Sequence, residues 1–246
     1  MKIEILFPEI CNLYGELFNM ELIRKSCSGA EFIETNLNDE PLFASEEPDL
    51  IYMGTMSEKA QEMVIEKLSQ YKKRITELIS SGAHFLITGN ALEVFGRKIA
   101  DKDGTVVKGL DIFPFTTERD MMNRFNSLYL GEFISDADTG HTMKIAGFKS
   151  QFTHSYWNDE ASPAPLFHTL RGPGLNPDIK EEGIRVNNFM ATYVIGPLLI
   201  LNPPFARYIL AECGAPECDV VFSDAAMDAY SARIAEYSDE STGFYY

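Results

Sequence analysis

The sequence is poor in positive charge and contains no long hydrophobic run. Its 246 residues include 21 lysines and arginines against 37 aspartates and glutamates, which gives a formal net charge of −16. A surface this acidic repels the phosphates of nucleic acids and of anionic membranes. No uninterrupted apolar run reaches the ~18 residues that a membrane-spanning helix needs. We therefore expect neither nucleic-acid binding nor membrane insertion.

Cysteine is also scarce, and an export signal is missing. The opening residues, MKIEILFPEI, are too charged and too short in apolar length for a secretory signal, so we expect a cytoplasmic protein. The four cysteines, Cys11, Cys27, Cys213 and Cys218, form no C-x-x-C pair and no zinc-ligand spacing. We predict four reduced thiols, no metal and no cofactor. A glycine and a proline between Cys213 and Cys218 indicate a turn there, not a metal site.

The order of the hydrophobic segments predicts an α/β fold in a single domain over residues 1–246. Strands are expected at 2–7, 31–37, 49–53 and 83–88, and helices at about 17–25 and 57–80. Strands that alternate with helices are typical of a parallel sheet with right-handed crossovers. Ser57 and Gly82 are suitable first and last caps of the longer helix.

The second half of the sequence has shorter apolar segments, which predict an antiparallel extension of the sheet. We expect strands at 129–134, 143–148, 183–187 and 191–201. The Gly- and Pro-rich stretch 162–178 is predicted to be a long surface loop. Two helices are expected near the end, at about 203–212 and 224–237.

The stretch from Ala83 to Gly96, AHFLITGNALEVFG, joins a buried strand to a helix with no loop between them. At such an elbow the side chain of the turn residue points into solvent, and the first N–H groups of the helix point the same way. Hydrolases use this arrangement for a nucleophile and an oxyanion. The residue that we place at the turn is Thr88. A simpler interpretation makes Thr88 an ordinary helix N-cap.

Four segments, taken in order, resemble one enzyme family. The first segment, NLYGELFN, is similar to the motif N-L-Y-G-D-x-x-N. The second, DLIYMGTMSEKAQ, is similar to a strand followed by G-G-G-Q-D, and the elbow is the third. The fourth, TYVIGPLLILNP, is similar to T-Y-x-H-G-P-x-L-x-x-N-P. The segment GLDIFPFTTERDMMNRFN is similar to G-L-G-L-x-x-x-x-T followed by an arginine. These are motifs of the CobB/CobQ-type class I glutamine amidotransferases. The sequence most resembles the glutaminase subunit of lipid II isoglutaminyl synthase.

The resemblance implies a flavodoxin-like fold with a doubly wound, mainly parallel sheet. It also implies a nucleophilic cysteine at the elbow and a histidine base near the end of the chain. Together these would hydrolyse the amide of glutamine and pass ammonia to a Mur-ligase-like synthetase partner. This sequence departs from the pattern, with Thr88 at the nucleophile position and Ile195 at the base position. Thr55 and Met56 replace glycines of the oxyanion loop, while Gly54 is kept.

Neither substituted residue can perform the family's chemistry. A threonine hydroxyl is protonated at neutral pH and needs an adjacent base, and isoleucine cannot accept a proton. A swing of His154 toward the elbow would supply a base, but a packed or solvent-facing histidine is the simpler interpretation. We therefore predict a catalytically degenerate pseudo-glutaminase that binds a synthetase partner or an amino-acid-like ligand such as glutamine.

The predicted ligand-binding residues lie along one cleft. They are Gly54, Thr88, Gly89, Asn90, Glu93 and Arg124. Arg124 matches the arginine that holds the substrate carboxylate in the family, although a surface ion pair is an equal alternative. A second hypothesis is an active amidotransferase, or another hydrolase or ligase subunit, that uses different residues of this cleft. A pKa of Glu93 shifted strongly by Arg124 would support that hypothesis.

Overall fold

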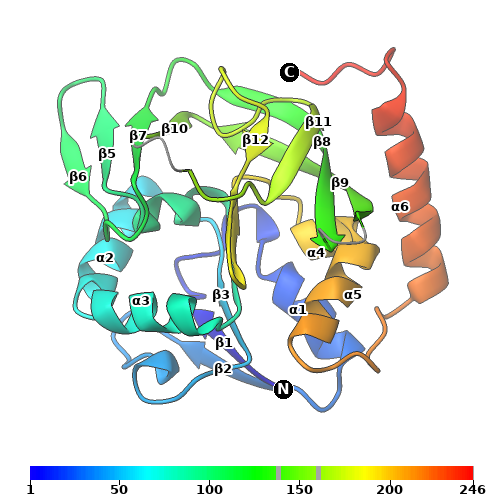
Figure 1. Cartoon of the computed structure of the whole chain (residues 1–246), viewed down its shortest axis with the longest axis horizontal. Coiled ribbons are helices and arrows are strands. Elements are labelled where there is room, and N and C mark those ends of the chain that lie inside the picture. Colours follow the sequence, from blue (N-terminus) through cyan, green and yellow to red (C-terminus); the bar gives the residue numbers. More distant parts are fainter. Residues whose placement is uncertain (137–139, 159–161, 246) are drawn as a thin grey trace.

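The computed structural model describes residues 1–136, 140–158 and 162–245, and a six-stranded sheet lies at its centre (Figure 1). The strand order is β13–β14–β4–β3–β1–β2. These strands are β1 (Lys2–Leu6), β2 (Glu31–Thr35), β3 (Leu50–Met53), β4 (Phe85–Thr88), β13 (Ile184–Val186) and β14 (Phe189–Thr192). All neighbours pair in parallel except β13, which is antiparallel to β14. The prediction of a mainly parallel sheet is confirmed.

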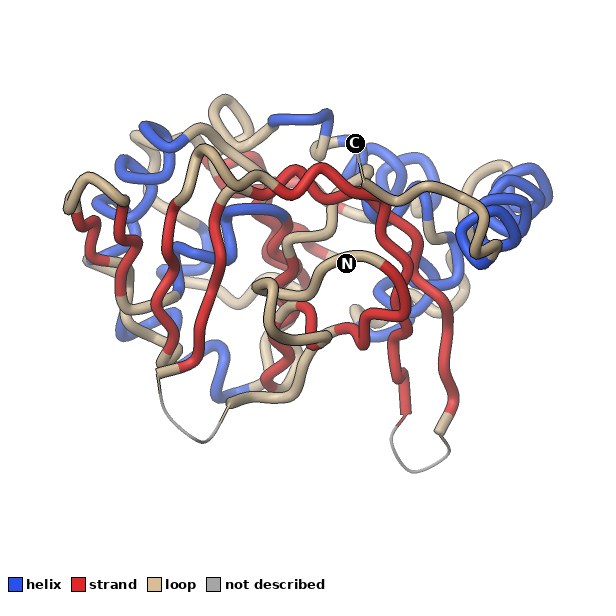
Figure 2. Tube along the Cα trace, turned by 90° about the horizontal axis from the view of Figure 1, so that it is seen from above, coloured by secondary structure: helices blue, strands red, loops and turns tan. Residues whose placement is uncertain are grey.

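Helices cover both faces of this sheet, because successive strand side chains point to opposite sides. The helices are α1 (Phe18–Ser26), α2 (Glu58–Ser69), α3 (Lys72–Ser81) and α5 (Pro203–Glu212). Ile87 of β4 packs in a core with α2 and α3, whereas its neighbour Leu86 packs in a second core with α1 and α5. Seen from above, helices flank the central strands on both sides (Figure 2). The doubly wound arrangement is therefore present.

The single helix expected at 57–80 is in fact two. Ser57 caps α2 as predicted, since its hydroxyl accepts a hydrogen bond from the Ala60 N–H at 3.3 Å. Gly82 ends α3 in the left-handed conformation, at φ +91°. Between the helices Tyr71 leaves helical geometry, and its ring packs edge-on against Phe43 at 5.6 Å. The apolar residues keep their helical spacing across this break, so the sequence pattern did not reveal it.

Two four-stranded sheets form the antiparallel extension, with orders β10–β7–β5–β6 and β12–β11–β8–β9. Their strands are β5 (Lys98–Asp101), β6 (Val106–Lys108), β7 (Phe115–Arg119), β8 (Phe125–Asp136), β9 (His141–Gln151), β10 (Thr153–Trp157), β11 (Phe167–Arg171) and β12 (Glu181–Glu182). All pairs are antiparallel except β5 with β7.

Two predictions for the second half are wrong. The stretch 162–178 is not simply a loop, because β11 lies within it and pairs with β8. The segment 191–201 is not one strand system, because β14 ends at Thr192 and α4 (Leu198–Leu201) is helical. The last predicted helix is present as α6 (Ser223–Ser238), at the edge of the molecule in Figure 1.

The cysteines also differ from expectation. Cys27 and Cys218 form a disulfide, with their Cα atoms 5.4 Å apart, so the prediction of four reduced thiols is wrong. The pairing joins the end of α1 to the segment before α6 across 191 residues, a separation that local spacing cannot reveal. Cys11 and Cys213 are free and buried. Within the described ranges, the structure contains no helix of the length and hydropathy required to cross a bilayer.

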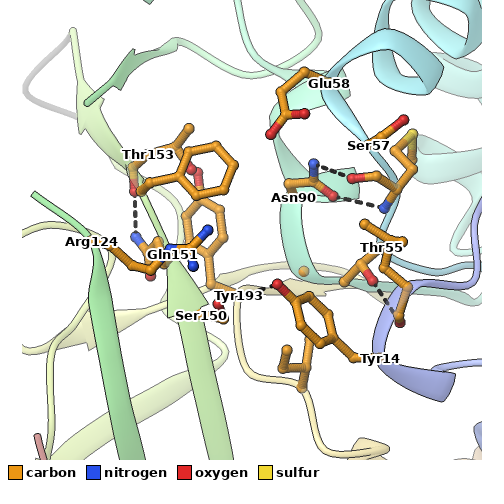
Figure 3. Close-up of a pocket in the computed structure, with 15 residues that line it drawn as sticks. Tyr14, Thr55, Ser57, Glu58, Asn90, Arg124, Ser150, Gln151, Thr153 and Tyr193 are labelled. Carbon is orange, nitrogen blue, oxygen red and sulfur yellow. Dashed lines mark hydrogen bonds between the residues drawn. The ribbon is translucent and has the colours of Figure 1, made fainter. Parts of the chain in front are cut away.

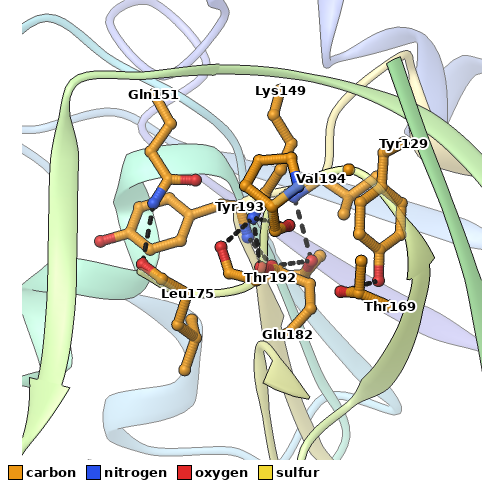
Figure 4. A network of polar contacts seen from close by, with 12 residues as sticks. Tyr129, Lys149, Gln151, Thr169, Leu175, Glu182, Thr192, Tyr193 and Val194 are labelled. Atoms are coloured by element: carbon orange, nitrogen blue, oxygen red, sulfur yellow. Dashed lines mark hydrogen bonds and ion pairs between the residues drawn. The ribbon is translucent and has the colours of Figure 1, made fainter. Parts of the chain in front are cut away.

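A buried ion pair ties the extension to the central sheet (Figure 4). The Lys149 ammonium on β9 contacts the Glu182 carboxylate on β12, and both side chains are fully buried. Lys149 also donates to the carbonyls of Pro173 and Gly174, at 3.1 and 2.7 Å. Glu182 Oε1 in turn accepts from the Thr192 hydroxyl at the end of β14, at 2.8 Å. The charges are thus matched by hydrogen bonds on both sides.

Candidate functional site

A cavity of about 180 Å³ lies where β3, β4 and β14 end and meet β9 and β10. In open α/β sheets, the carboxyl ends of the strands are the usual place for ligands. Thr55, Gly89 and Tyr193 come from the ends of the central strands, and Arg124 faces them from the start of β8 (Figure 3). Of the predicted ligand-binding residues, Gly89, Asn90 and Arg124 line this cavity, whereas Gly54, Thr88 and Glu93 do not.

Gly89, not Thr88, is the turn residue of the elbow. Gly89 has φ +63°, the left-handed conformation that glycine adopts readily, and it begins the 3₁₀ helix η3 (Gly89–Phe95). Thr88 is the last residue of β4, fully buried and extended, and its side chain caps no N–H group. Both interpretations of Thr88, as an open turn residue and as an N-cap, are therefore wrong. Strand alternation turns its side chain toward the core.

Beneath the elbow, the Thr88 hydroxyl belongs to a buried polar network. It lies 3.3 Å from the Tyr52 hydroxyl and also bonds the Glu16 carboxylate. Glu16 accepts further hydrogen bonds from the Gly196 N–H at 2.9 Å and the Asn19 amide at 3.0 Å. Burial raises the pKa of Glu16, and these hydrogen bonds oppose the rise. The sequence did not predict this network, although the NLYGELFN segment, which supplies Glu16 and Asn19, was identified as a family motif.

Above the elbow, carbon atoms of Thr55 and Ile195 fill the space beside Gly89. A Cβ atom built on Gly89 would lie 1.8 Å from Thr55 Cγ2 and 3.4 Å from Ile195 Cγ2. The Thr55 hydroxyl donates to the Leu13 carbonyl at 2.9 Å, which fixes its rotamer. Among the described residues, no cysteine or histidine lines the cavity.

Glu93 lies behind the cavity wall and does not meet Arg124. Its two carboxylate oxygens accept from the Thr153 hydroxyl at 2.5 Å and the Gln61 amide at 2.9 Å. Burial raises the pKa of Glu93, and the cation that opposes the rise is Arg119. The Glu93–Arg124 pair that an alternative enzyme would need is therefore not formed.

The other candidates have clear local roles. Both ends of the Asn90 amide bond the backbone of Met56, at 3.0 and 2.8 Å, which holds the loop after β3. Gly54 allows close packing, because a Cβ there would lie 2.7 Å from the Cys11 carbonyl oxygen. His154 is buried with its ring edge-on to Phe125 and does not line this cavity, so it supplies no base at the elbow. Burial lowers its pKa.

Arg124 is exposed, and its guanidinium lies 5.3 Å from the centre of the Phe152 ring. No described acidic residue forms an ion pair with it, so the ion-pair alternative is not observed in that part of the chain. The described residues also contain no cluster of three or more His, Cys, Asp or Glu side chains that could hold a metal ion.

Comparison with known proteins shows what this arrangement is similar to. Residues 2–202 match the model of the CobB/CobQ-like glutamine amidotransferase domain. The sequence is 29% identical over 204 residues to the lipid II isoglutaminyl synthase (glutamine-hydrolyzing) subunit GatD of Staphylococcus aureus strain N315, covering 82% of this chain and 79% of that protein. It is 22% identical over 244 residues to the GatD subunit of Streptococcus pneumoniae, covering 97% and 91%.

Solved structures agree on the fold. PurLQS from Thermotoga maritima superposes with a TM-score of 0.55 at 9% identity, covering 95% of this chain and 98% of that one. A glutamine amidotransferase from the same organism superposes with a TM-score of 0.52 at 10% identity, covering 96% and 94%. Because the family model spans most of the sequence, this chain belongs to the CobB/CobQ-like glutamine amidotransferase family.

Proposed function

We propose that this protein is a catalytically degenerate member of its family, which holds an amino-acid-like ligand without hydrolysing it. The observation that carries the proposal is the geometry at the elbow. The turn residue, Gly89, has no side chain, and the neighbouring Ile195 cannot accept a proton. Amide hydrolysis through a covalent intermediate needs both a nucleophile and a base. Loss of the base alone costs about 10²–10⁴-fold in rate.

We further propose that the protein works with a synthetase partner. The two relatives are named as subunits of a synthase, and this chain covers 79% and 91% of their lengths. The network under the elbow supports an intact scaffold, since Glu16 and Asn19 bond the Gly196 and Leu199 N–H groups. A Mur-ligase-like synthetase is the partner that the family resemblance favours.

Ammonia release from L-glutamine tests the first proposal. We expect the purified protein, alone and with a candidate synthetase, to release no more ammonia than a protein-free blank. Arg124→Ala is the matched variant, because it removes the cavity's cation from an exposed position and leaves the elbow intact. Turnover by the wild type that disappears in Arg124→Ala would show that the cavity is an active glutaminase site and would overturn the proposal.

A further inference from the structure

Two opposite charges face the cavity from opposite walls. Arg124 enters from the start of β8, and Glu58 enters from the first turn of α2 (Figure 3). In the described part of the chain neither side chain takes part in an ion pair, whereas the nearby Arg119 is bonded to Asp101 at 2.9 Å. A separated cation and anion on facing walls match a ligand that carries both charges.

Gln151 also lines the cavity, but its side-chain amide is held within the protein. Its side chain is only 3% exposed, and its amide nitrogen donates to the carbonyls of Thr153 and Leu175, at 2.7 and 3.0 Å. These two bonds fix which end of the amide is oxygen. Gln151 Oε1 accepts no hydrogen bond from any described residue. This oxygen is inaccessible to solvent, so it offers no acceptor to a ligand in the cavity.

The polar side chains near the elbow are, in contrast, already satisfied. The Asn90 amide is bonded to the Met56 backbone, and the Thr55 hydroxyl is bonded to the Leu13 carbonyl. The surface that remains there consists of the Thr55 methyl group and the Ile195 side chain beside Gly89. The Tyr14 hydroxyl donates to Ser150 at 3.2 Å, so this end of the cavity offers apolar contact, and the described polar side chains there already have partners.

The cavity is also small. Its volume of about 180 Å³ is below the roughly 300–1,000 Å³ of sites for drug-sized ligands and cofactors. The ligand therefore has few heavy atoms.

We propose that the cavity selects a small aliphatic α-amino acid over glutamine. This inference rests on the proposed function, because it places the ligand in the same cavity. The carboxylate lies on Arg124, and the ammonium group lies on Glu58. The aliphatic side chain then extends toward Thr55 and Ile195. Glutamine is disfavoured because its amide would be buried there without a side-chain partner.

Calorimetric titration with four probes tests this assignment. L-norleucine has the proposed charges and an unbranched apolar side chain, hexanoic acid lacks only its ammonium group, pentylamine lacks only its carboxylate, and L-glutamine ends in an amide. We expect L-norleucine to bind at least about tenfold more tightly than each of the other three, the factor that about 1.4 kcal/mol supplies. Equal or tighter binding of L-glutamine, or no binding of L-norleucine, would overturn the inference.

Glu58→Gln is the decisive variant, because Glu58 is half-buried at the start of α2 and its side chain supports no described hydrogen bond. The preference for L-norleucine over hexanoic acid should fall at least about fivefold in Glu58→Gln, whereas the preference over pentylamine should remain. An unchanged preference over hexanoic acid would remove Glu58 from the site. Ammonia release, which tests the proposed function, is independent of these ratios, so the two ideas fail separately.

Discussion

The Lys149–Glu182 pair and the Arg124–Glu58 pair each combine a cation with a carboxylate, but their surroundings are opposite. Lys149 and Glu182 are in contact, fully buried and bonded to further polar groups. Arg124 and Glu58 lie apart on the walls of a cavity. A charge that is satisfied within the protein holds the structure together. Charges that remain unsatisfied beside a cavity are available to a ligand.

The two sides of the elbow repeat this contrast. Below it, Glu16, Asn19, Tyr52 and Thr88 form a saturated hydrogen-bond network. Above it, Gly89 faces only methyl groups among its close side-chain neighbours. The polar groups under the elbow are thus satisfied by one another, while the space above it is apolar.

The largest effect is expected from breaking the buried pair. Lys149→Met should lower the free energy of unfolding by about 3–5 kcal/mol, because it leaves the Glu182 carboxylate buried and uncompensated. Adding Glu182→Gln removes the charge and keeps an oxygen acceptor for the Thr192 hydroxyl, so the double variant should regain part of the loss. Urea denaturation measures both. A loss below about 1 kcal/mol in the single variant, as for exposed pairs, would contradict the contrast drawn above.

A smaller effect is expected from filling the elbow. Gly89→Cys should cost about 2–4 kcal/mol, because its Cβ would collide with Thr55 and its backbone must keep a positive φ. In a Thr55→Gly background the same substitution should cost at least about 1 kcal/mol less, since the two sites are in contact. Thermal or urea unfolding of the wild type, the two single variants and the double variant measures the coupling free energy between the two sites. Equal costs in both backgrounds would show that Thr55 does not occupy the nucleophile's space.

The smallest effect is expected at Thr88. Thr88→Val removes one hydroxyl from the network under the elbow and should lower the free energy of unfolding by about 1–2 kcal/mol. Because the Thr88 side chain is buried and does not line the cavity, the affinity for L-norleucine should change less than about twofold. Unchanged stability together with lost binding would place the hydroxyl in the cavity instead.

The sequence predicted the central sheet well, because strands buried on both faces have continuous apolar runs that need no knowledge of their neighbours. It predicted β11 and α4 poorly. β11 lies in a Gly- and Pro-rich stretch and owes its existence to pairing with β8, about 40 residues earlier. The apolar run of α4, LLIL, fits a strand as well as a helix. The disulfide between Cys27 and Cys218 depends on tertiary contact across 191 residues.

At the elbow the sequence interpretation was wrong by one residue. Thr88 is β-branched and suits the end of a strand, whereas Gly89 alone tolerates the positive φ of the turn. This difference between a β-branched residue and a glycine is enough to place the turn at Gly89. Arg124 was found because it matches an arginine of the family motif, and Asn90 was found because it follows the elbow directly. Glu58 was missed, because a charge without a partner is recognisable only when its neighbours are known.

The central claim is that no cysteine nucleophile faces the cavity in the described part of the chain, and an electrophilic glutamine analogue tests it most directly. The analogue carries a diazoketone in place of the side-chain amide, and intact-mass spectrometry detects the covalent product. We predict no adduct on the wild-type protein, and an adduct on the variant that combines Thr55→Gly, Gly89→Cys and Ile195→His. A stoichiometric adduct on a cavity residue of the wild type would contradict the account.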